Sequence, residues 1–215
     1  MRKSILWLKM WFTYPVIFFT YLHSIRASYI EQQNMLKVWS VILLKMTKTK
    51  VEVINSNLIP LEDGYLFISN HRSTYDGLVL INGIPINVGF YLHNSERTPY
   101  LKLFIKLIGS VKYTNETLYE TNDLIKQKLS QKLNIATFIN TLDQKRVDSQ
   151  ILASCYQNQN AIIPIVIRNS RNMVKKAYTK VELVFCTPLH YEEYGALSYN
   201  DCLVEIQRRM NEETN

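Results

Sequence analysis

The sequence predicts an α/β domain with a mixed, largely parallel sheet flanked by helices, preceded by an N-terminal helical hairpin. From residue 48 onward, short apolar or alternating runs typical of strands alternate with segments that have helical spacing. Such an order favours a layered domain whose strands are mostly parallel. Before residue 48, the chain holds two longer apolar segments of helical character. With 215 residues, 47% of them hydrophobic, the chain is long enough for one well-buried core.

The elements of the α/β domain follow one another in a regular order. The run Val51–Ile54 alternates in polarity, whereas Tyr65–Ile68 and Ala161–Ile167 are almost wholly apolar, as buried strands are. The expected strands are 51–54, 65–68, 88–92, 111–113, 135–139, 161–167 and 180–185, and the expected helices are 77–81, 99–108, 122–133, 147–156 and 198–211. We therefore expect the α/β domain to occupy residues 48–215.

The N-terminal segment, residues 1–47, predicts a membrane anchor. Residues 1–50 hold eight Lys or Arg residues against one acid, Glu31, and this excess of +7 equals the formal charge of the whole chain. The same residues are rich in aromatic and aliphatic side chains. Basic and apolar residues together suit an anionic membrane surface better than a nucleic acid. We expect membrane lipids as partners, no nucleic acid, and a location on the cytoplasmic face of the cell membrane.

Two arrangements of this anchor are open. The two helices are expected at about residues 5–22 and 29–46. The uncharged run from residue 10 to 22 would extend only ~20 Å as a helix, against a hydrocarbon core of ~30 Å. Pro15 would also kink it. The favoured arrangement is a hairpin that lies in one leaflet, and the alternative is a transmembrane helix followed by an amphipathic one.

Several classes of site find no support in the sequence. The three cysteines have no paired or C-x-x-C spacing and are expected to be reduced thiols of a protein that faces the cytosol. The four histidines have no metal-ligand spacing, so no metal is expected. The chain also lacks the G-x-S-x-G elbow of lipase-like hydrolases.

One stretch carries the candidate chemistry, Asn70-His71-Arg72-Ser73-Thr74-Tyr75-Asp76. It lies between a predicted strand and a predicted helix. Residues five apart on a regular helix do not face each other, so a contact between His71 and Asp76 requires an irregular turn. An imidazole held by a carboxylate can take a proton from an attacking hydroxyl. The alternative is that His71 packs locally and Asp76 is an ordinary acid at a helix start.

The pattern N-H-x-S-x-x-D resembles the first signature of the glycerophospholipid acyltransferases, the family that contains the 1-acylglycerol-3-phosphate (lysophosphatidic acid) acyltransferases. The family also has a V-x-V strand and a segment ending in proline ahead of this signature, and Val51–Val53 and Asn57–Pro60 hold those places. Its fourth signature, an apolar strand with a central proline, is matched by Ile163–Ile167. The resemblance covers residues 45 to 190, approximately.

The chain departs from the family in the two blocks that bind the acceptor. Gly109 fits the glycine of the second signature, but Asn115 stands where the family has an arginine that binds phosphate. Of the third signature, F-P-E-G-T-R, the aligned run Phe138–Asp143 keeps the phenylalanine alone. The residues that could supply a replacement cation are Arg72, Lys112, Lys145, Arg146 and Arg168, and we favour Arg168 because it ends the proline-bearing strand.

The resemblance implies a glycerol-3-phosphate acyltransferase-like fold and an acyltransferase of phospholipid biosynthesis. Its donor would be acyl-CoA or acyl carrier protein, its acceptor a lysophospholipid, with 1-acylglycerol-3-phosphate expected, and it would need no bound cofactor or metal. His71 would be the general base and Asp76 its orienter. The residues expected to bind substrate are Asn70, Arg72, Ser73, Gly109, Asn115 and Arg168. For Asn70 and Ser73 the alternative is that they fix the turn. The alternatives are a non-catalytic relative that binds lipid or a partner, and an acyltransferase with a different acceptor.

Overall fold

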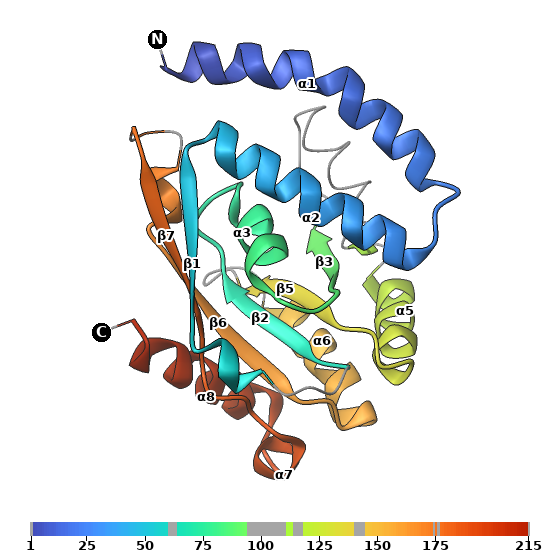
Figure 1. The fold of residues 1–215 in the computed structure, drawn as a ribbon. Coiled ribbons are helices and arrows are strands. Elements are labelled where there is room, and N and C mark those ends of the chain that lie inside the picture. Colours follow the sequence, from blue (N-terminus) through green and yellow to red (C-terminus); the bar gives the residue numbers. More distant parts are fainter. Residues whose placement is uncertain are drawn as a thin grey trace.

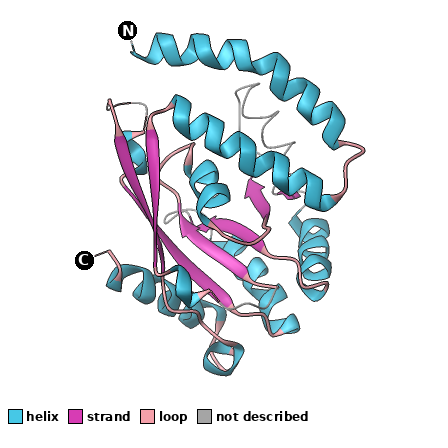
Figure 2. Cartoon of the chain, in the orientation of Figure 1, coloured by secondary structure: helices cyan, strands magenta, loops and turns pink. Residues whose placement is uncertain are grey.

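The central feature of the fold is a seven-stranded sheet with the order β1-β7-β6-β2-β5-β3-β4 (Figures 1 and 2). The computed structural model describes residues 2–59, 64–93, 111–113, 118–139, 145–173, 175 and 177–214. The strands are β1 (Thr49–Ile54), β2 (Leu66–Asn70), β3 (Gly89–His93), β4 (Val111–Tyr113), β5 (Ile135–Ile139), β6 (Ile162–Arg168) and β7 (Thr179–Phe185). Neighbouring strands are parallel except for β6 and β7, which are antiparallel. The predicted mixed, largely parallel sheet is confirmed.

The helices flank this sheet. They are α1 (Arg2–Ser24), α2 (Tyr29–Met46), α3 (Asp76–Gly83), α5 (Leu118–Ser130), α6 (Lys145–Asn158), α7 (Tyr191–Tyr194) and α8 (Tyr199–Glu212). The helix predicted at 99–108 lies outside the described residues. The short helix α7 was not expected, because four residues are too few to show a helical period.

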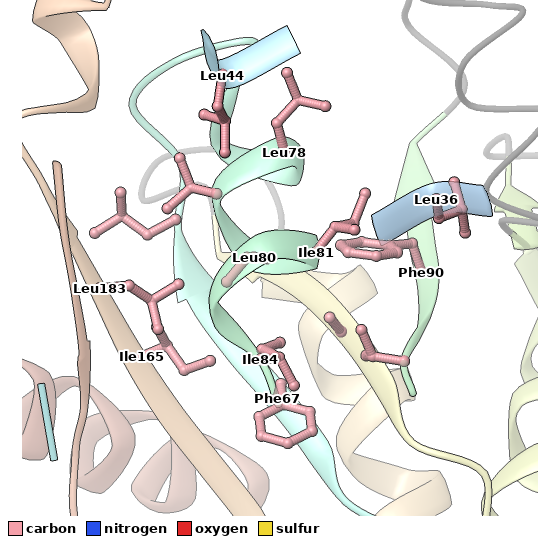
Figure 3. Packing of buried hydrophobic residues seen from close by; sticks show 14 of the residues in the cluster. Leu36, Leu44, Phe67, Leu78, Leu80, Ile81, Ile84, Phe90, Ile165 and Leu183 are labelled. Atoms are coloured by element: carbon pink, nitrogen blue, oxygen red, sulfur yellow. The ribbon is translucent and has the colours of Figure 1, made fainter. Parts of the chain in front are cut away.

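The sheet separates two hydrophobic cores. On one face, α2 and α3 pack against the strands (Figure 3). The side chains labelled there are Leu36 and Leu44 of α2, Leu78, Leu80 and Ile81 of α3, Ile84, and Phe67, Phe90, Ile165 and Leu183 of the strands. On the other face, α5, α6 and α8 cover a second core. Burial on both faces explains why β2 up to Ile68 and β6 up to Ile167 are continuous apolar runs in the sequence.

The two N-terminal helices form the predicted hairpin, and α2 also belongs to the first core. A capping box starts α2: the hydroxyl of Ser28 accepts the Glu31 N–H, and the Glu31 carboxylate accepts the Ser28 N–H at 2.7 Å. Leu36 and Leu44 then face the sheet. Of the helices described here, none is both long and apolar enough to cross a membrane. The division at residue 47 and the membrane contact stay predictions.

The start of the central strand is fixed by one buried amide. Asn134, just before β5, accepts the backbone N–H groups of Gly64 and Tyr65 at 2.9 and 3.0 Å. Its amide nitrogen donates to the carbonyl of Asn87 ahead of β3 at 3.0 Å. Gly64 has a φ of +95° and passes close to the Cα of Lys132, a conformation and an approach that suit glycine. These contacts bring β2, β5 and β3 into register at their amino ends.

Candidate active site

The candidate site lies where β2 ends, in the middle of the sheet. Strands β2, β3, β4, β5 and β6 run parallel, so their carboxyl ends meet at one edge. His71 follows β2 directly, and Asn70 is in register with Ile139 at the end of β5. Open α/β sheets place reactive groups at this edge because loops and helix starts converge there.

The five-residue spacing of His71 and Asp76 is explained by a tight turn. The backbone N–H of Asp76 donates to the carbonyl of Ser73 at 2.9 Å, and α3 begins at Asp76. The hydroxyl of Ser73 accepts the Tyr75 N–H at 3.3 Å. The chain therefore folds back on itself between β2 and α3, which brings the two side chains together although a regular helix would keep them apart.

The carboxylate of Asp76 is the centre of this turn. Its Oδ2 lies 3.3 Å from Nδ1 of His71 and accepts the backbone N–H groups of Arg72 and Ser73, both at 2.7 Å. The Asp76 side chain is fully buried, whereas that of His71 is 34% exposed. The contact at Nδ1 assigns the proton of a neutral His71 to that nitrogen. The buried acid thus orients an imidazole that is partly exposed to solvent.

The ring of Phe138, on β5, packs against the His71 ring. The two ring centroids are 4.7 Å apart and the planes are tilted by 44°. Among the described residues, His71 is thus held by Asp76 at Nδ1 and by contact with the Phe138 ring. Nε2 is the remaining nitrogen, and it is the atom at which a hydroxyl proton would be accepted.

The other polar residues of the motif, Asn70, Arg72 and Ser73, mainly make hydrogen bonds that hold the backbone of the site. The Asn70 side chain makes two hydrogen bonds to the backbone of Ile167 on β6. Arg72 has an exposed side chain and supplies its N–H to Asp76. Ser73 supplies both its N–H and its hydroxyl to the turn. Substrate contacts by these three residues stay predictions.

Arg168, the favoured phosphate cation, is paired with an acid. Its guanidinium Nη1 lies 3.2 Å from a carboxylate oxygen of Glu182, directly across β6 and β7. Alternation along β6 places Arg168 on the same face of the sheet as Val166, the face covered by α6 and α8, whereas Phe138 packs against the core of the opposite face. The structure therefore does not bring the Arg168 side chain together with His71, and its role in substrate binding stays a prediction.

Other predicted residues fall outside the described part of the chain. Gly109, Asn115 and the run 140–143 are among them, and so are the side chains of Lys112, Lys145 and Arg146. Strand β4 ends at Tyr113, at the edge of the sheet where β2 also ends.

The described residues show neither a metal cluster nor a solvent-exposed cysteine thiol. They contain no group of three or more His, Cys, Asp or Glu side chains able to hold a metal ion. All three cysteines are buried and free. Burial raises the pKa of Cys186 to about 12 and that of Cys202 to about 11, so both thiols are protonated at neutral pH.

The fold matches that of a solved enzyme structure. The crystal structure of the 1-acyl-sn-glycerophosphate (LPA) acyltransferase PlsC from Thermotoga maritima superimposes with a TM-score of 0.72 and 17% sequence identity. The match covers 100% of this chain and 98% of that chain. This chain has the acyltransferase fold. No protein-family model matches the sequence, and no curated protein matches it either.

Within the acyltransferase fold, two contacts of the site were not foreseen. The signal for Phe138 was present, since it is the surviving residue of the third block, but its packing on His71 depends on the register of β5 and β2. The Asn70 contact with Ile167 joins residues 97 positions apart, and nothing in the local sequence predicts it. A cavity of about 350 Å³ near Asn87 and Asn134 lies at the amino ends of β3 and β5, away from the edge that carries His71.

Proposed function

We propose that this protein is a membrane-surface acyltransferase. It would move a fatty acyl chain from a thioester of coenzyme A or acyl carrier protein to a lysophospholipid, with 1-acylglycerol-3-phosphate as the expected acceptor. The observation that carries the proposal is the contact of His71 with the buried Asp76 at the carboxyl end of β2, in an acyltransferase fold. The N-H-x-S-x-x-D pattern supports the same chemistry.

In the proposed reaction, Nε2 of His71 accepts the proton of the acceptor hydroxyl as its oxygen attacks the thioester carbonyl carbon. The tetrahedral intermediate then collapses, the carbon–sulfur bond breaks, and the imidazolium returns the proton to the leaving thiolate. Asp76 stabilises the imidazolium through Nδ1, and the N–H groups of Arg72 and Ser73 keep its carboxylate in place. The products are a diacyl lipid and a free thiol.

The surface of α1 and α2 supports a site of action on a membrane, on its cytoplasmic face. Trp11, Phe12 and Phe19 of α1 are 77%, 72% and 68% exposed, and Val38 of α2 is 58% exposed. Large apolar side chains on a folded surface indicate a contact with lipid or protein. The basic excess of residues 1–50 favours a surface of anionic lipid. A lysophospholipid acceptor resides in such a surface.

An altered acceptor is the second candidate. A phosphate dianion is normally met by an arginine, but Asn115 stands at the arginine position of the family. The favoured replacement, Arg168, is paired with Glu182. Both observations favour an acceptor whose headgroup carries less charge than a terminal phosphate.

The test is acyl transfer in vesicles, with acyl-CoA and acyl carrier protein thioesters as donors. Wild type, His71→Ala and His190→Ala are compared on 1-acylglycerol-3-phosphate and on a panel of other lysolipids. His190 is an exposed histidine at the start of α7 and serves as the matched control. Transfer that is lost in His71→Ala and kept in His190→Ala supports the proposal. Lipid binding without His71-dependent transfer to any acceptor would indicate a non-catalytic relative.

A further inference from the structure

We infer that Asn70 is a positioning residue whose side chain holds the His71–Asp76 turn by clamping the end of β2 to β6. The kinetic part of this inference rests on the proposed function, and the geometric part does not. The sequence motif leaves Asn70 two roles, to bind substrate or to fix the turn, and the structure directs its amide at the backbone of a neighbouring strand.

The clamp uses both polar groups of one amide. Oδ1 of Asn70 accepts the N–H of Ile167 at 2.7 Å, and Nδ2 donates to the carbonyl of Ile167 at 3.1 Å. A side-chain amide that pairs with both groups of one backbone residue imitates the next residue of a strand. The backbone register of β2 and β6 runs from Leu66 opposite Ile162 to Ser69 opposite Ile165. Beyond that point, the Asn70 side chain continues the pairing.

Because the Asn70 side chain, not the backbone, pairs with Ile167, the main chain after Asn70 can leave the sheet. After Asn70, the chain leaves the sheet so that the N–H groups of Arg72 and Ser73 can point at Asp76. A main chain that continued the β2 ladder could not make that turn. A main chain with no clamp would leave Ile167 unpaired and the start of the turn free to move. Asn70 therefore fixes the point from which the His71 side chain is presented.

The chain offers a matched control at the other end of the same two strands. Asn160 precedes β6, and its Nδ2 donates to the carbonyl of Gly64 ahead of β2 at 2.8 Å. Both asparagines thus tie β2 to β6 through one side-chain amide, but Asn160 does so at the edge opposite His71. If loss of the amide only weakened the sheet, alanine variants of both asparagines would show the same effect. If Asn70 positions the turn, only its variant affects His71.

The experiment compares Asn70→Ala and Asn160→Ala with wild type in two measurements. The first is acyl transfer in vesicles. We expect kcat of Asn70→Ala to fall about 10- to 100-fold with KM within about threefold, because a displacement of the base of about 1 Å is enough for such a loss. We expect Asn160→Ala to keep kcat within about twofold, since its site lies away from the chemistry.

The second measurement needs no activity. Two-bond ¹H–¹⁵N spectra of histidine-labelled protein report which ring nitrogen carries the proton, and His71→Ala identifies the His71 signals. We expect wild type and Asn160→Ala to hold the proton on Nδ1, because Asp76 accepts from it. In Asn70→Ala we expect a mixture of both tautomers. If Asn70→Ala fails to fold, the isosteric Asn70→Asp, which loses the donor to Ile167, replaces it.

The outcomes separate the inference from the proposed function. An unchanged tautomer in the Asn70 variant overturns the inference, and so does an equal effect in Asn160→Ala. A raised KM at unchanged kcat also overturns it, because Asn70 would then contact substrate. If wild type transfers no acyl chain to any acceptor, the proposed function fails, and the tautomer comparison still decides the role of Asn70.

Discussion

The His71 imidazole and the Phe138 ring pack at a centroid distance of 4.7 Å, across the boundary between β2 and β5. Asp76 restrains the histidine at one nitrogen, and a single hydrogen bond leaves the ring free to rotate about that axis. Packing against the Phe138 ring limits this rotation. Within the third signature block of the family, this phenylalanine is the residue that the chain retains. Its packing on His71 gives this residue a place in the proposed site.

Removing this support should lower turnover more than substrate binding. We expect Phe138→Ala to reduce kcat about tenfold or more, since a loosened base spends less time aligned with the acceptor hydroxyl. Phe138→Leu keeps an apolar contact and should retain more activity than the alanine variant. Steady-state kinetics in vesicles give kcat, and thermal unfolding serves as the control for stability. A lowered midpoint of unfolding with unchanged kcat would contradict the supporting role.

The contribution of the negative charge of Asp76 can be separated from that of its hydrogen bonds by two substitutions. In Asp76→Asn, the amide oxygen can still accept the N–H groups of Arg72 and Ser73, and the amide nitrogen takes the place of Oδ1, which has no hydrogen-bond partner among the described residues. We expect a fall in kcat of about 10³-fold or more, because the imidazolium loses its counter-charge. We expect the fold to survive.

Asp76→Ala is the comparison for this variant. It leaves two backbone N–H groups without their acceptor, so we expect it to lower the free energy of unfolding by about 2–4 kcal/mol. Urea unfolding at neutral pH measures the difference. If Asp76→Asn were destabilised as much as Asp76→Ala, the negative charge itself would be what holds the turn.

The centre of the sheet could be predicted because its strands are buried on both faces. The runs Leu66–Ile68 and Ile162–Ile167 of these strands are continuously apolar, and they can be found without knowledge of the neighbouring strands. The sequence also shows that α2 has an apolar face, but it does not show whether that face packs against lipid or against the protein core. Periodicity cannot distinguish a helix that faces lipid from one that faces a core, and the structure packs Leu36 and Trp39 of α2 into the core.

In the candidate site, too, local contacts could be predicted from the sequence and contacts between distant residues could not. The motif spans seven residues, so the turn that joins His71 to Asp76 could be expected from the sequence. The pairings of Asn70 with Ile167 and of Arg168 with Glu182 depend on strand order and register. Those properties arise from the packing of the whole sheet.

The C-terminal helix should give stability that depends on pH in the acid range. Hydrogen bonds from Arg208 and then Arg209 lower the pKa of Glu205 from 4.5 to about 2. A folded-state pKa below the unfolded value stabilises the folded form above the unfolded pKa, and the stabilisation is lost as pH falls through the folded pKa. The difference in free energy of unfolding between wild type and Glu205→Gln should therefore be complete above pH 4.5 and vanish toward pH 2.

Urea unfolding at a series of pH values measures this difference. Glu192→Gln is the control, since Glu192 is an exposed acid of α7 with no ion pair in the described residues. The pH dependence of the Glu205→Gln difference is compared with that of this variant. A Glu205→Gln difference that persisted undiminished near pH 2 would show that packing, not charge, is what the glutamate contributes.

The exposed face of α1 should bind anionic vesicles, and two valines test this directly. Val16 of α1 and Val204 of α8 are 55% and 63% exposed, so the same change to glutamate can be made at either site with little effect on the core. Figure 1 places α1 and α8 at opposite ends of the molecule. We expect Val16→Glu to lower the vesicle partition coefficient about three- to tenfold, because an apolar contact is lost and a repelled charge is added. Val204→Glu should bind as wild type does. Sedimentation with vesicles of anionic and zwitterionic lipid measures both, and equal losses in the two variants would place the membrane contact elsewhere.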